Sequence, residues 1–406
     1  MKYEIEVISP VHIGSGGTIS PIEYVVEDNF YRADMDRLFE DERFDTDGFI
    51  EDAKAGAFYL GRFAPGVAKE HVRYALDISE SARTNLQGLI GRLSRSSEVR
   101  EHIKTKDEAY IPGSSVKGAI RTAILWWVLK NDADRFDRAK KHLNNLVRSR
   151  DRVDKKRVDD EIEKLVFGAD PTEDIFKALQ VSDTSVVNVK ELRIEEVRTL
   201  TTTSQGHNWK GFYTYVEALK PGTKLALETK IDEFLLEDDA ASELHFENKK
   251  GLVREIPRIC NEFADMFIED EMRFFRQYNR PGELDDVLEF YEKLRERREE
   301  DSFLLHLAWG SGWHGMTVGS LLKEDSEFDF LNLRKKFQLG EIRRCKRCGE
   351  RIRGNYCPKC RKKLYPNEIK RIYVPEYPKT RRLVFKDGKP KYPLGWLKIR
   401  FEEERK

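Results

Sequence analysis

The stretch AYIPGSSVKGAIRTAILWWVL (Ala109–Leu129) places a loop rich in glycine and serine directly before an apolar helix. Glycine allows positive φ and lets another backbone approach closely. Successive peptide N–H groups in such a loop, beside a helix N-terminus, can bind an anion. Lys117 and Arg121 lie one helical turn apart and therefore share a face of the predicted helix. The stretch predicts an anion-binding loop anchored by a buried helix.

Two more glycine-rich loops follow the same pattern. The segment YEIEVIS (Tyr3–Ser9) alternates with period two, which predicts a strand, and it leads into PVHIGSGG. A late segment, WGSGWHG (309–315), follows the apolar run FLLHLA. It adds Trp313 and His314, which can stack on a base or contact a phosphate. Three such loops in one chain favour a polyanion ligand over three unrelated turns.

None of these loops has a complete nucleotide-binding fingerprint. GSSVKG is not a P-loop, because Lys117 precedes the second glycine instead of following it. GSGGTIS has Ile19 where the dinucleotide fingerprint needs its third glycine. GSGWHG has that spacing, but a charged run and a cysteine cluster follow it where a second parallel strand would be required. The polyanion is therefore not predicted to be a bound nucleotide cofactor.

The net charge of zero hides a strong asymmetry along the chain. From Arg334 to Arg382 there are 18 Lys and Arg against 4 Asp and Glu, a balance of +14. Residues 231–300 carry 21 acidic against 11 basic residues, a balance of −10. Charge runs are usually solvated faces, but together with the glycine loops this pattern indicates one face for a polyanion and another for a different partner.

Four of the five cysteines lie in CKRCGERIRGNYCPKC: Cys345, Cys348, Cys357 and Cys360. Two C-x-x-C pairs at this separation are typical of one tetrahedral zinc ion. No run of about 18 apolar residues occurs and the N-terminus does not resemble a signal peptide, so we expect a soluble, cytoplasmic protein without a membrane partner. In that compartment disulfides are disfavoured. The prediction is a structural zinc ribbon, with Cys260 as a packed core residue.

Strand and helix patterns intermix without a regular βα alternation, which predicts an α+β fold. We expect an N-terminal domain over 1–230 with a helical insertion at 132–168. A mainly helical, acidic segment should follow at 231–300, and a C-terminal region over 301–406 should contain the zinc ribbon at 341–363. Further predicted elements are a helix over 82–103, strands at 178–186 and 223–231, a loop or hairpin at 201–215 and a closing hairpin at 381–401.

The segments PVHIGSGG, YIPGSSVKGAIRTA and WGSGWHGMTVG together resemble the RAMP superfamily of CRISPR-associated RNA-binding proteins. ALQVSDTS and KTRRLVFKDGKPKYPLGWLKI are most similar to one of its subfamilies, the fifth subunit of the type III-A (Csm) effector complex. The matches spread from residue 7 to residue 400. The resemblance implies ferredoxin-like, RRM-type domains whose glycine loops hold guide RNA. The zinc ribbon is not implied by it and rests on cysteine spacing alone.

The resemblance also implies a role and partners. The protein would be a non-catalytic subunit that binds CRISPR guide RNA toward its 3′ end, caps the filament of backbone RAMP subunits and is needed for guide maturation, with host ribonucleases as candidate partners. The RNA-binding residues would be His12, Gly14, Ser15, Gly16, Gly113, Ser114, Ser115, Lys117, Gly118, Arg121, Gly310, Ser311, Gly312, Trp313 and His314.

Two other functions stay open from the residues. His12, His207 and His314 lie in or beside the loops, so a metal-independent endoribonuclease that processes guide RNA is one alternative. A zinc-ribbon module that binds DNA or an acidic protein is the other. Asp34 precedes a helical pattern and is predicted to be its N-cap, so no catalytic role is assigned to it.

Overall fold

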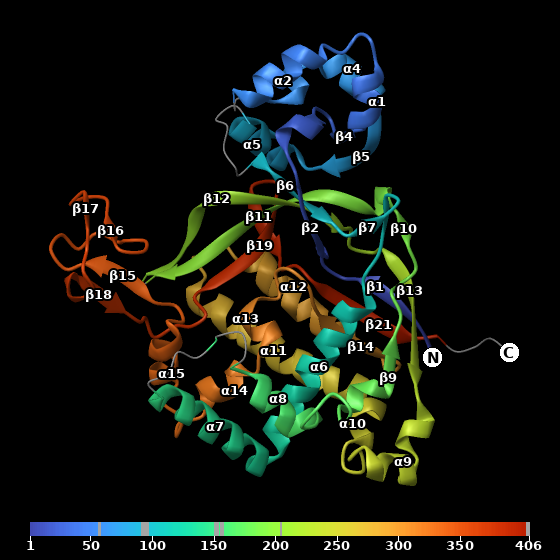
Figure 1. Ribbon diagram of the computed structural model, residues 1–406, viewed down its shortest axis with the longest axis vertical. Coiled ribbons are helices and arrows are strands. Elements are labelled where there is room, and N and C mark those ends of the chain that lie inside the picture. The colour runs from blue at the N-terminus through green and yellow to red at the C-terminus, as the bar shows by residue number, and fades with distance from the viewer. Residues whose placement is uncertain (56–57, 91–96, 150–153, 155–157, 204, 403–406) are drawn as a thin grey trace. The chain divides into compact units, whose positions relative to one another are not determined.

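The computed structural model describes residues 1–55, 58–90, 97–149, 154, 158–203 and 205–402 (Figure 1). The chain forms two compact units, each assembled from segments that are distant in sequence. Unit 1 is Met1–Ile124, Ile175–Met316 and Thr380–Lys406, and unit 2 is Leu125–Asp174 and Thr317–Lys379. The predicted ranges 1–230 and 301–406 each contain residues of both units, whereas 231–300 lies within unit 1.

Unit 1 contains a five-stranded antiparallel sheet with the order β14-β21-β1-β13-β9. Its strands are β1 (Lys2–Val7), β9 (Leu179–Val181), β13 (Lys224–Ile231), β14 (Ser302–His306) and β21 (Trp396–Phe401). The alternation that predicts β1 is confirmed, since Ile5 and Val7 are fully buried and pair with β13 and β21. Of the strand predicted at 178–186, only Leu179–Val181 forms.

A second, nine-stranded sheet of unit 1 has the order β2-β6-β12-β11-β5-β4-β3, with β19 and β20 continuing from β11. Its strands are β2 (Gly14–Ile19), β3 (Tyr24–Val26), β4 (Phe30–Ala33), β5 (Val72–Ile78), β6 (Val99–His102), β11 (Leu192–Thr203), β12 (Gly206–Leu219), β19 (Thr380–Lys386) and β20 (Lys389–Tyr392). The long β11–β12 hairpin confirms the hairpin predicted at 201–215 (Figure 1). Mixed helices and sheets confirm the α+β class.

Two local predictions are wrong for identifiable reasons. Of the helix predicted over 82–103, the first part lies in α5 (Glu80–Ile90), residues 91–96 lie outside the described residues, and Val99–His102 is strand β6. Val99 and His102 are buried in the sheet, so tertiary pairing overrides the weak helical period. The closing segment 381–401 is divided between two sheets: β19 and β20 form a hairpin, whereas β21 joins the five-stranded sheet.

Short helices follow β4 and surround a core of phenylalanines. They are α1 (Met35–Glu40), α2 (Thr46–Lys54), α3 (Leu60–Phe63) and α4 (Pro65–Glu70), and the 3-10 turn η1 (Pro21–Glu23) precedes β3. Phe44, Phe49 and Phe58 form the centre of this core, with edge-to-face or tilted ring contacts. The Asp34 carboxylate accepts a hydrogen bond from the Arg37 N–H at 3.3 Å, which confirms the predicted N-cap of α1.

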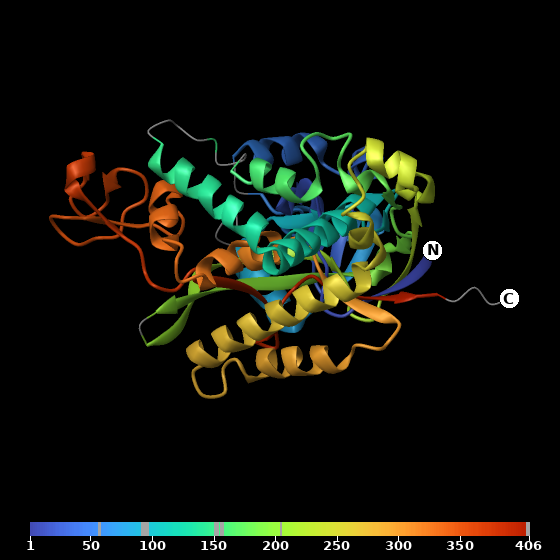
Figure 2. The ribbon, with the colours of Figure 1, turned by 90° about the horizontal axis from the view of Figure 1, so that it is seen from below.

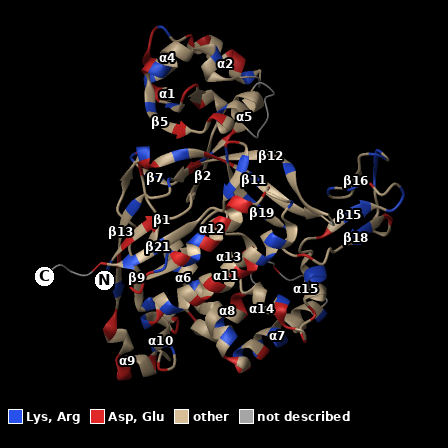
Figure 3. Ribbon diagram, turned by 180° about the vertical axis from the view of Figure 1, so that it is seen from behind, with Lys and Arg blue, Asp and Glu red and all other residues tan. Residues whose placement is uncertain are grey.

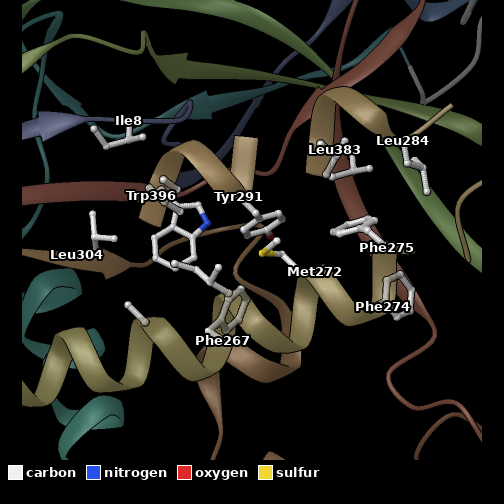
Figure 4. Close-up of a cluster of buried hydrophobic side chains, with 14 of the residues drawn as sticks. Ile8, Phe267, Met272, Phe274, Phe275, Leu284, Tyr291, Leu304, Leu383 and Trp396 are labelled. Atoms are coloured by element: carbon white, nitrogen blue, oxygen red, sulfur yellow. The ribbon is translucent and has the colours of Figure 1, made fainter. Parts of the chain in front are cut away.

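The acidic segment 231–300 is helical, as predicted, and its apolar faces close the core of unit 1. It contains η6 (Glu233–Leu236), α9 (Asp238–Glu243), α10 (Lys250–Arg254), α11 (Ile256–Tyr278) and α12 (Asp285–Glu296). Helices α11 and α12 run side by side (Figure 2). Phe267, Phe275, Tyr291 and Trp396 pack together between these helices and the sheet (Figure 4). Cys260 is buried in α11, which confirms that it is a core residue.

Helix α6 (Gly113–Asn131) begins at the first glycine of the opening stretch and becomes apolar along its length, as predicted. A three-stranded ladder precedes and accompanies it, made of β7 (Lys104–Thr105), β8 (Glu108–Ala109) and β10 (Val187–Asn188). The turns η4 (Ile175–Lys177) and η5 (Val189–Glu191) flank β9 and β10, and α13 (Gly312–Met316) follows the late glycine loop.

Unit 2 combines a helical group with a small cysteine-bearing module. The helices are α7 (Ala133–Arg148), α8 (Asp160–Phe167), α14 (Gly319–Glu324) and α15 (Phe330–Phe337). The helical stretch predicted at 132–168 contains α7 and α8, and the break predicted at 150–153 lies outside the described residues. Lys140 fastens the helical group, since its ammonium is 2.8 Å from the Asp325 carboxylate.

Residues 341–372, called the cysteine module below, form two short ladders. Strand β15 (Ile342–Cys345) pairs with β18 (Ile369–Ile372), and β16 (Tyr356–Cys357) pairs with β17 (Lys362–Lys363), with the turn η7 (Pro366–Glu368) before β18. Across the part of the chain that the structure describes, no helix is both long and apolar enough to span a bilayer.

Candidate nucleic-acid interface

The first glycine loop is a bulged edge strand. Strand β2 pairs with β6 through Gly14 and again from Thr18, and the register shifts between them. The intervening residues 15–17 are exposed, and Gly16 has φ of +92°, which a residue with a side chain rarely adopts. The Ser15 hydroxyl contacts the Glu101 carboxylate at 3.3 Å and accepts the Gly17 N–H at 3.1 Å. The main chain of the bulge is exposed, but the Ser15 hydroxyl already contacts two groups of the protein.

His12, predicted to contact RNA, is 1% exposed. Its Nδ1–H donates to the Glu217 carbonyl oxygen at 2.7 Å, and burial lowers its pKa to about 4 despite that bond. The ring is therefore neutral near pH 7 and lies inside the fold. His12 is covered by β12 and holds the start of the glycine loop against that strand.

His102 joins two of the predicted loops. Its Nδ1 accepts the Ile13 N–H at 3.2 Å, so Nε2 carries the proton and donates it to the Tyr110 carbonyl at 3.2 Å. Burial lowers the pKa of His102 to about 3, which keeps the ring neutral. One imidazole thereby fixes the chain just before the β2 bulge and just before GSSVKG. Sequence reasoning missed this residue, since nothing local marks it.

A buried carboxylate lies beneath the same region. Glu217 is fully buried and accepts hydrogen bonds from the His102 N–H at 2.9 Å and the Tyr74 hydroxyl at 2.8 Å. It also accepts from the ammonium of Lys104, whose side chain is 5% exposed. These bonds satisfy both carboxylate oxygens and the buried cation.

The start of α6 differs from the predicted open anion cradle. The Gly113 N–H donates to the Asp183 carboxylate at 2.8 Å, so an internal anion already occupies this position. A Cβ at residue 113 would lie 2.3 Å from the Ser182 carbonyl oxygen, which explains why glycine stands here. Ser114 and Gly118 are exposed on the first turns, and Ser115 is half-buried.

Lys117 and Arg121 share a helix face, as predicted, and this face meets η4 and the start of β9. Both cations lie over the Phe176 ring, at 5.9 and 5.3 Å from its centroid. The Lys117 ammonium donates to the carbonyl oxygens of Phe176 and Leu179 at 2.8 and 2.6 Å. Lys117 thus holds the segment between η4 and β9 against helix α6, a role that its position in the sequence does not reveal.

Most of the late glycine loop also points inward. Ser311 and His314 are 4% and 5% exposed, and the Ser311 hydroxyl donates to the Ala308 carbonyl at 2.8 Å. Gly310 has φ of +119° and lies against Leu394, where a Cβ would be 2.9 Å from the Leu394 Cβ. Gly312 is exposed and Trp313 is half-buried. Gly310 is half-buried as well, so Ser311 and His314 are the predicted residues of this loop that have almost no surface to offer a ligand.

The late loop meets the β2 region through Trp309, which was not among the predicted site residues. The Trp309 N–H donates to the His12 carbonyl at 3.2 Å, and the two rings contact edge to face at 5.7 Å between centroids. The indole packs on Val197, Val216 and Val384 of the sheet. Trp309 is half-buried, so the residue keeps some exposed surface.

Two exposed arginines flank this tryptophan. The guanidinium carbons of Arg100 and Arg382 lie 4.9 and 4.6 Å from the centroid of the Trp309 ring. Within the described residues, no carboxylate lies at ion-pair distance from either guanidinium. Partial burial, and then the charge of Arg100, lower the pKa of Arg382. Arg100 is also the ladder partner of Thr18, directly after the β2 bulge.

We call residues 15–17, Arg100, Trp309 and Arg382 the Trp309 face. It combines two positive charges that have no carboxylate partner among the described residues, an aromatic ring and an exposed glycine backbone. Single-stranded nucleic acids are bound by this set of groups, because cations follow the phosphates and rings stack on bases. Arg100 and Arg382 are far apart in sequence, and only the sheet brings them together.

The three histidines considered for RNA cleavage are all buried. His207 is 1% exposed, with Nδ1 at 2.8 Å from the Tyr278 carbonyl and Nε2 at 3.0 Å from Glu283. His12 and His314 are enclosed as described above. A general acid or base must reach the 2′-hydroxyl or leaving oxygen of its substrate, which none of these rings does in the present conformation.

The four module cysteines gather around one point. Their sulfur atoms all lie within 4.8 Å of one another, with Cys345 to Cys360 at 3.9 Å and Cys348 to Cys357 at 3.5 Å. Four sulfurs bound to one zinc ion at about 2.3 Å would be roughly 3.8 Å apart. The Cys360 N–H also donates to the Cys357 sulfur at 3.3 Å. This arrangement could hold one metal ion.

Comparisons with known proteins agree with the fold. A family model described as the RAMP superfamily matches residues 4–316. A Methanocaldococcus jannaschii protein named CRISPR system Cms protein Csm5 is 25% identical over 99% of this chain and 89% of its own length. A Mycobacterium tuberculosis protein of the same name is 26% identical over 55% of this chain and 64% of its own length.

Two solved structures are also similar. One is a chain of a structure described as a Csm–crRNA–target RNA ternary complex in a type III-A CRISPR-Cas system. Its TM-score is 0.69 and its sequence identity is 25%, and the match covers 98% of this chain and 100% of that chain. The other is the crystal structure of T. onnurineus Csm5, with a TM-score of 0.64 and 23% identity over 97% of this chain and 99% of that chain. The latter similarity is evidence for the fold alone.

Proposed function

The chain belongs to the RAMP superfamily, and on that premise we propose that it is a guide-RNA-binding subunit of a type III-A CRISPR interference complex. It binds toward the 3′ end of the guide, caps the filament of backbone RAMP subunits and is needed for guide maturation without cutting RNA itself. Similarity to Csm5 proteins and to a chain of a Csm–crRNA–target RNA complex supports this assignment.

The observation that carries the proposal is the Trp309 face. Exposed arginines are usually paired or solvated, yet Arg100 and Arg382 lie over one indole and raise each other's electrostatic energy. A phosphate chain would relieve that repulsion, and a base could stack on the accessible part of Trp309. The main-chain N–H groups of Ser15 and Gly16 would add neutral donors beside it, since the Gly17 N–H already donates to the Ser15 hydroxyl.

The proposed contacts are therefore a subset of the predicted ones together with new ones. The exposed or half-buried residues remain as contacts: Gly14, Ser15, Gly16, Ser114, Ser115, Gly118, Gly310, Gly312 and Trp313. Arg100, Trp309 and Arg382 are added. The other predicted residues act as positioning residues, because their contacts within the protein hold the loops in place: His12, Gly113, Lys117, Arg121, Ser311 and His314.

The five-stranded sheet fits the ferredoxin-like, RRM-type domain that the family implies. Elements β1, α6, β9, β13, α11 and β21 follow one another as βαββαβ, with strand order β21-β1-β13-β9 and β14 added at the edge. We also propose that the cysteine module holds one zinc ion as a structural cofactor, since the four thiolates have the spacing and chemistry of such sites.

Salt dependence tests the RNA assignment. In single-stranded nucleic acids each phosphate contact contributes about 0.7 to the slope of log K against log salt. The variant R100Q/R382Q is therefore expected to lower the magnitude of that slope by roughly 1.4, measured by fluorescence anisotropy with guide RNA. The matched control is K54Q/K190Q, two exposed lysines of unit 1 with the same charge change. Equal slopes for both variants would remove the Trp309 face from the proposal.

A further inference from the structure

The cysteine module carries a charge far above that of the chain as a whole. Residues 341–372 contain 12 Lys and Arg against 3 Asp and Glu, a balance of +9. Figure 3 shows the basic residues along β15, β16 and β18. A metal site needs its four thiolates and a small core, and it does not need this excess of cations.

Three of these cations form one row across the strands. Arg344 pairs with Lys370 across the β15–β18 ladder and with Arg351 on its other side. The main-chain N–H of Ile352 donates to the carbonyl oxygen of Arg343, and the main-chain N–H of Cys345 donates to that of Glu350. Arg344 and Arg351 therefore form the narrow, non-hydrogen-bonded type of pair. In such pairs the side chains lie on one face, with Cα atoms about 4.5 Å apart.

This row is unfavourable for the protein alone. Like charges directly opposite each other destabilise a sheet. The Arg344 guanidinium donates to the Gly349 carbonyl, and no carboxylate among the described residues lies at ion-pair distance from any of the three cations. Two of the three module acids are engaged elsewhere: Glu341 with Arg343 and Tyr373, and Glu368 with Lys362. All three row residues are exposed.

A second row places an aromatic ring between cations. Tyr356 pairs with Lys363 across the β16–β17 ladder and with Arg353 through an isolated bridge. Tyr356 is 51% exposed, and Tyr365, two residues after Lys363, is 74% exposed. Exposed aromatic rings among cations are the combination on which bases of single strands stack.

We propose that the cysteine module is a second binding surface of this chain, for single-stranded nucleic acid. Phosphates contact the Arg351–Arg344–Lys370 row, and a base stacks on Tyr356. The surface shares no residue with the Trp309 face, and its existence does not depend on the guide-RNA assignment. An acidic protein could satisfy the charges but would leave the exposed tyrosines without a matching partner.

The test uses the full chain with its metal and two probes, poly(U) RNA and oligo(dT) DNA. The variant R344Q/R351Q/K370Q is expected to lower the magnitude of the salt slope for at least one probe by roughly 2, as three lost phosphate contacts predict. The control K54Q/K106Q/K190Q has the same charge change on scattered exposed lysines. Y356A is expected to weaken binding by about fivefold or more. The probe that responds identifies the strand type.

Other outcomes would overturn the inference. In one such outcome, R344Q/R351Q/K370Q has the same salt slope as its control for both probes, while R100Q/R382Q still lowers the slope for guide RNA. That result would exclude the module as a binding surface and would leave the guide-RNA assignment unchanged. Displacement of poly(U) by poly-glutamate at equal charge concentration would identify an acidic protein as the occupant. Without nucleic acid, R344Q/R351Q/K370Q is expected to melt no lower than the parent at low salt, and a clear fall would show that the row is structural.

Discussion

Removing the metal from the cysteine module is expected to unfold residues 341–372. The module has a core of only four buried residues, Cys345, Ile352, Cys357 and Leu364, and two of them are ligands of the proposed ion. Binding of structural zinc contributes about 10–16 kcal/mol in comparable small modules, so nothing else in the module can replace it. Chelation with EDTA should therefore make its many Lys and Arg residues accessible to trypsin.

The measurement is limited trypsin digestion followed by mass spectrometry, with metal content determined in parallel. Cleavage should appear inside 341–372 while α11 and the five-stranded sheet stay protected. The variant C345S/C348S should lose the metal and show the same cleavage without chelator. C260A is the matched control, because Cys260 is buried in α11 and should leave one metal per chain. A module that stays protected with no metal bound would contradict the zinc assignment.

Replacing Glu217 is expected to destabilise unit 1 by about 3–5 kcal/mol, because E217A would remove the fully buried carboxylate that the Lys104 ammonium contacts and leave that cation with the half-buried Glu101 carboxylate, 3.5 Å away. The Tyr74 hydroxyl and the His102 N–H would lose their acceptor as well. The free energy of unfolding, measured by urea denaturation, would report this loss.

A double-mutant cycle with Lys104 separates the charge effect from lost packing. K104M/E217Q removes both charges, so it should be clearly more stable than E217Q alone. RNA affinity should fall with E217A at temperatures where the protein remains folded, since His102 fixes the chain before both glycine segments. A change of stability below about 0.5 kcal/mol for E217A would show that the network is not required.

Features that depend on residues close together in the sequence were predictable. The alternation of Tyr3–Ser9, the apolar length of α6, the Asp34 cap and the cysteine cluster each depend on neighbours a few residues away. The cysteines gather because each C-x-x-C turn points both sulfurs at one place, whatever the rest of the chain does.

Features made by distant segments were not predictable. Arg100 and Arg382 flank Trp309 only because β6 and β19 belong to one sheet. Lys117 reads as a free cation in the sequence, and the carbonyl oxygens that it binds come from residues about sixty positions later. His12 follows a strand and precedes glycines, which is typical of an exposed position, yet β12 covers it.

Photo-crosslinking tests the central claim, that the Trp309 face holds an RNA strand, most directly. The full chain would be bound to guide RNA carrying 4-thiouridine, irradiated, and the crosslinked peptides identified by mass spectrometry. Crosslinks are predicted at Trp309 and within residues 14–18, and R100Q/R382Q should reduce them. Crosslinks confined to the acidic helices α11 and α12, with none at Trp309 in the parent protein, would contradict the account.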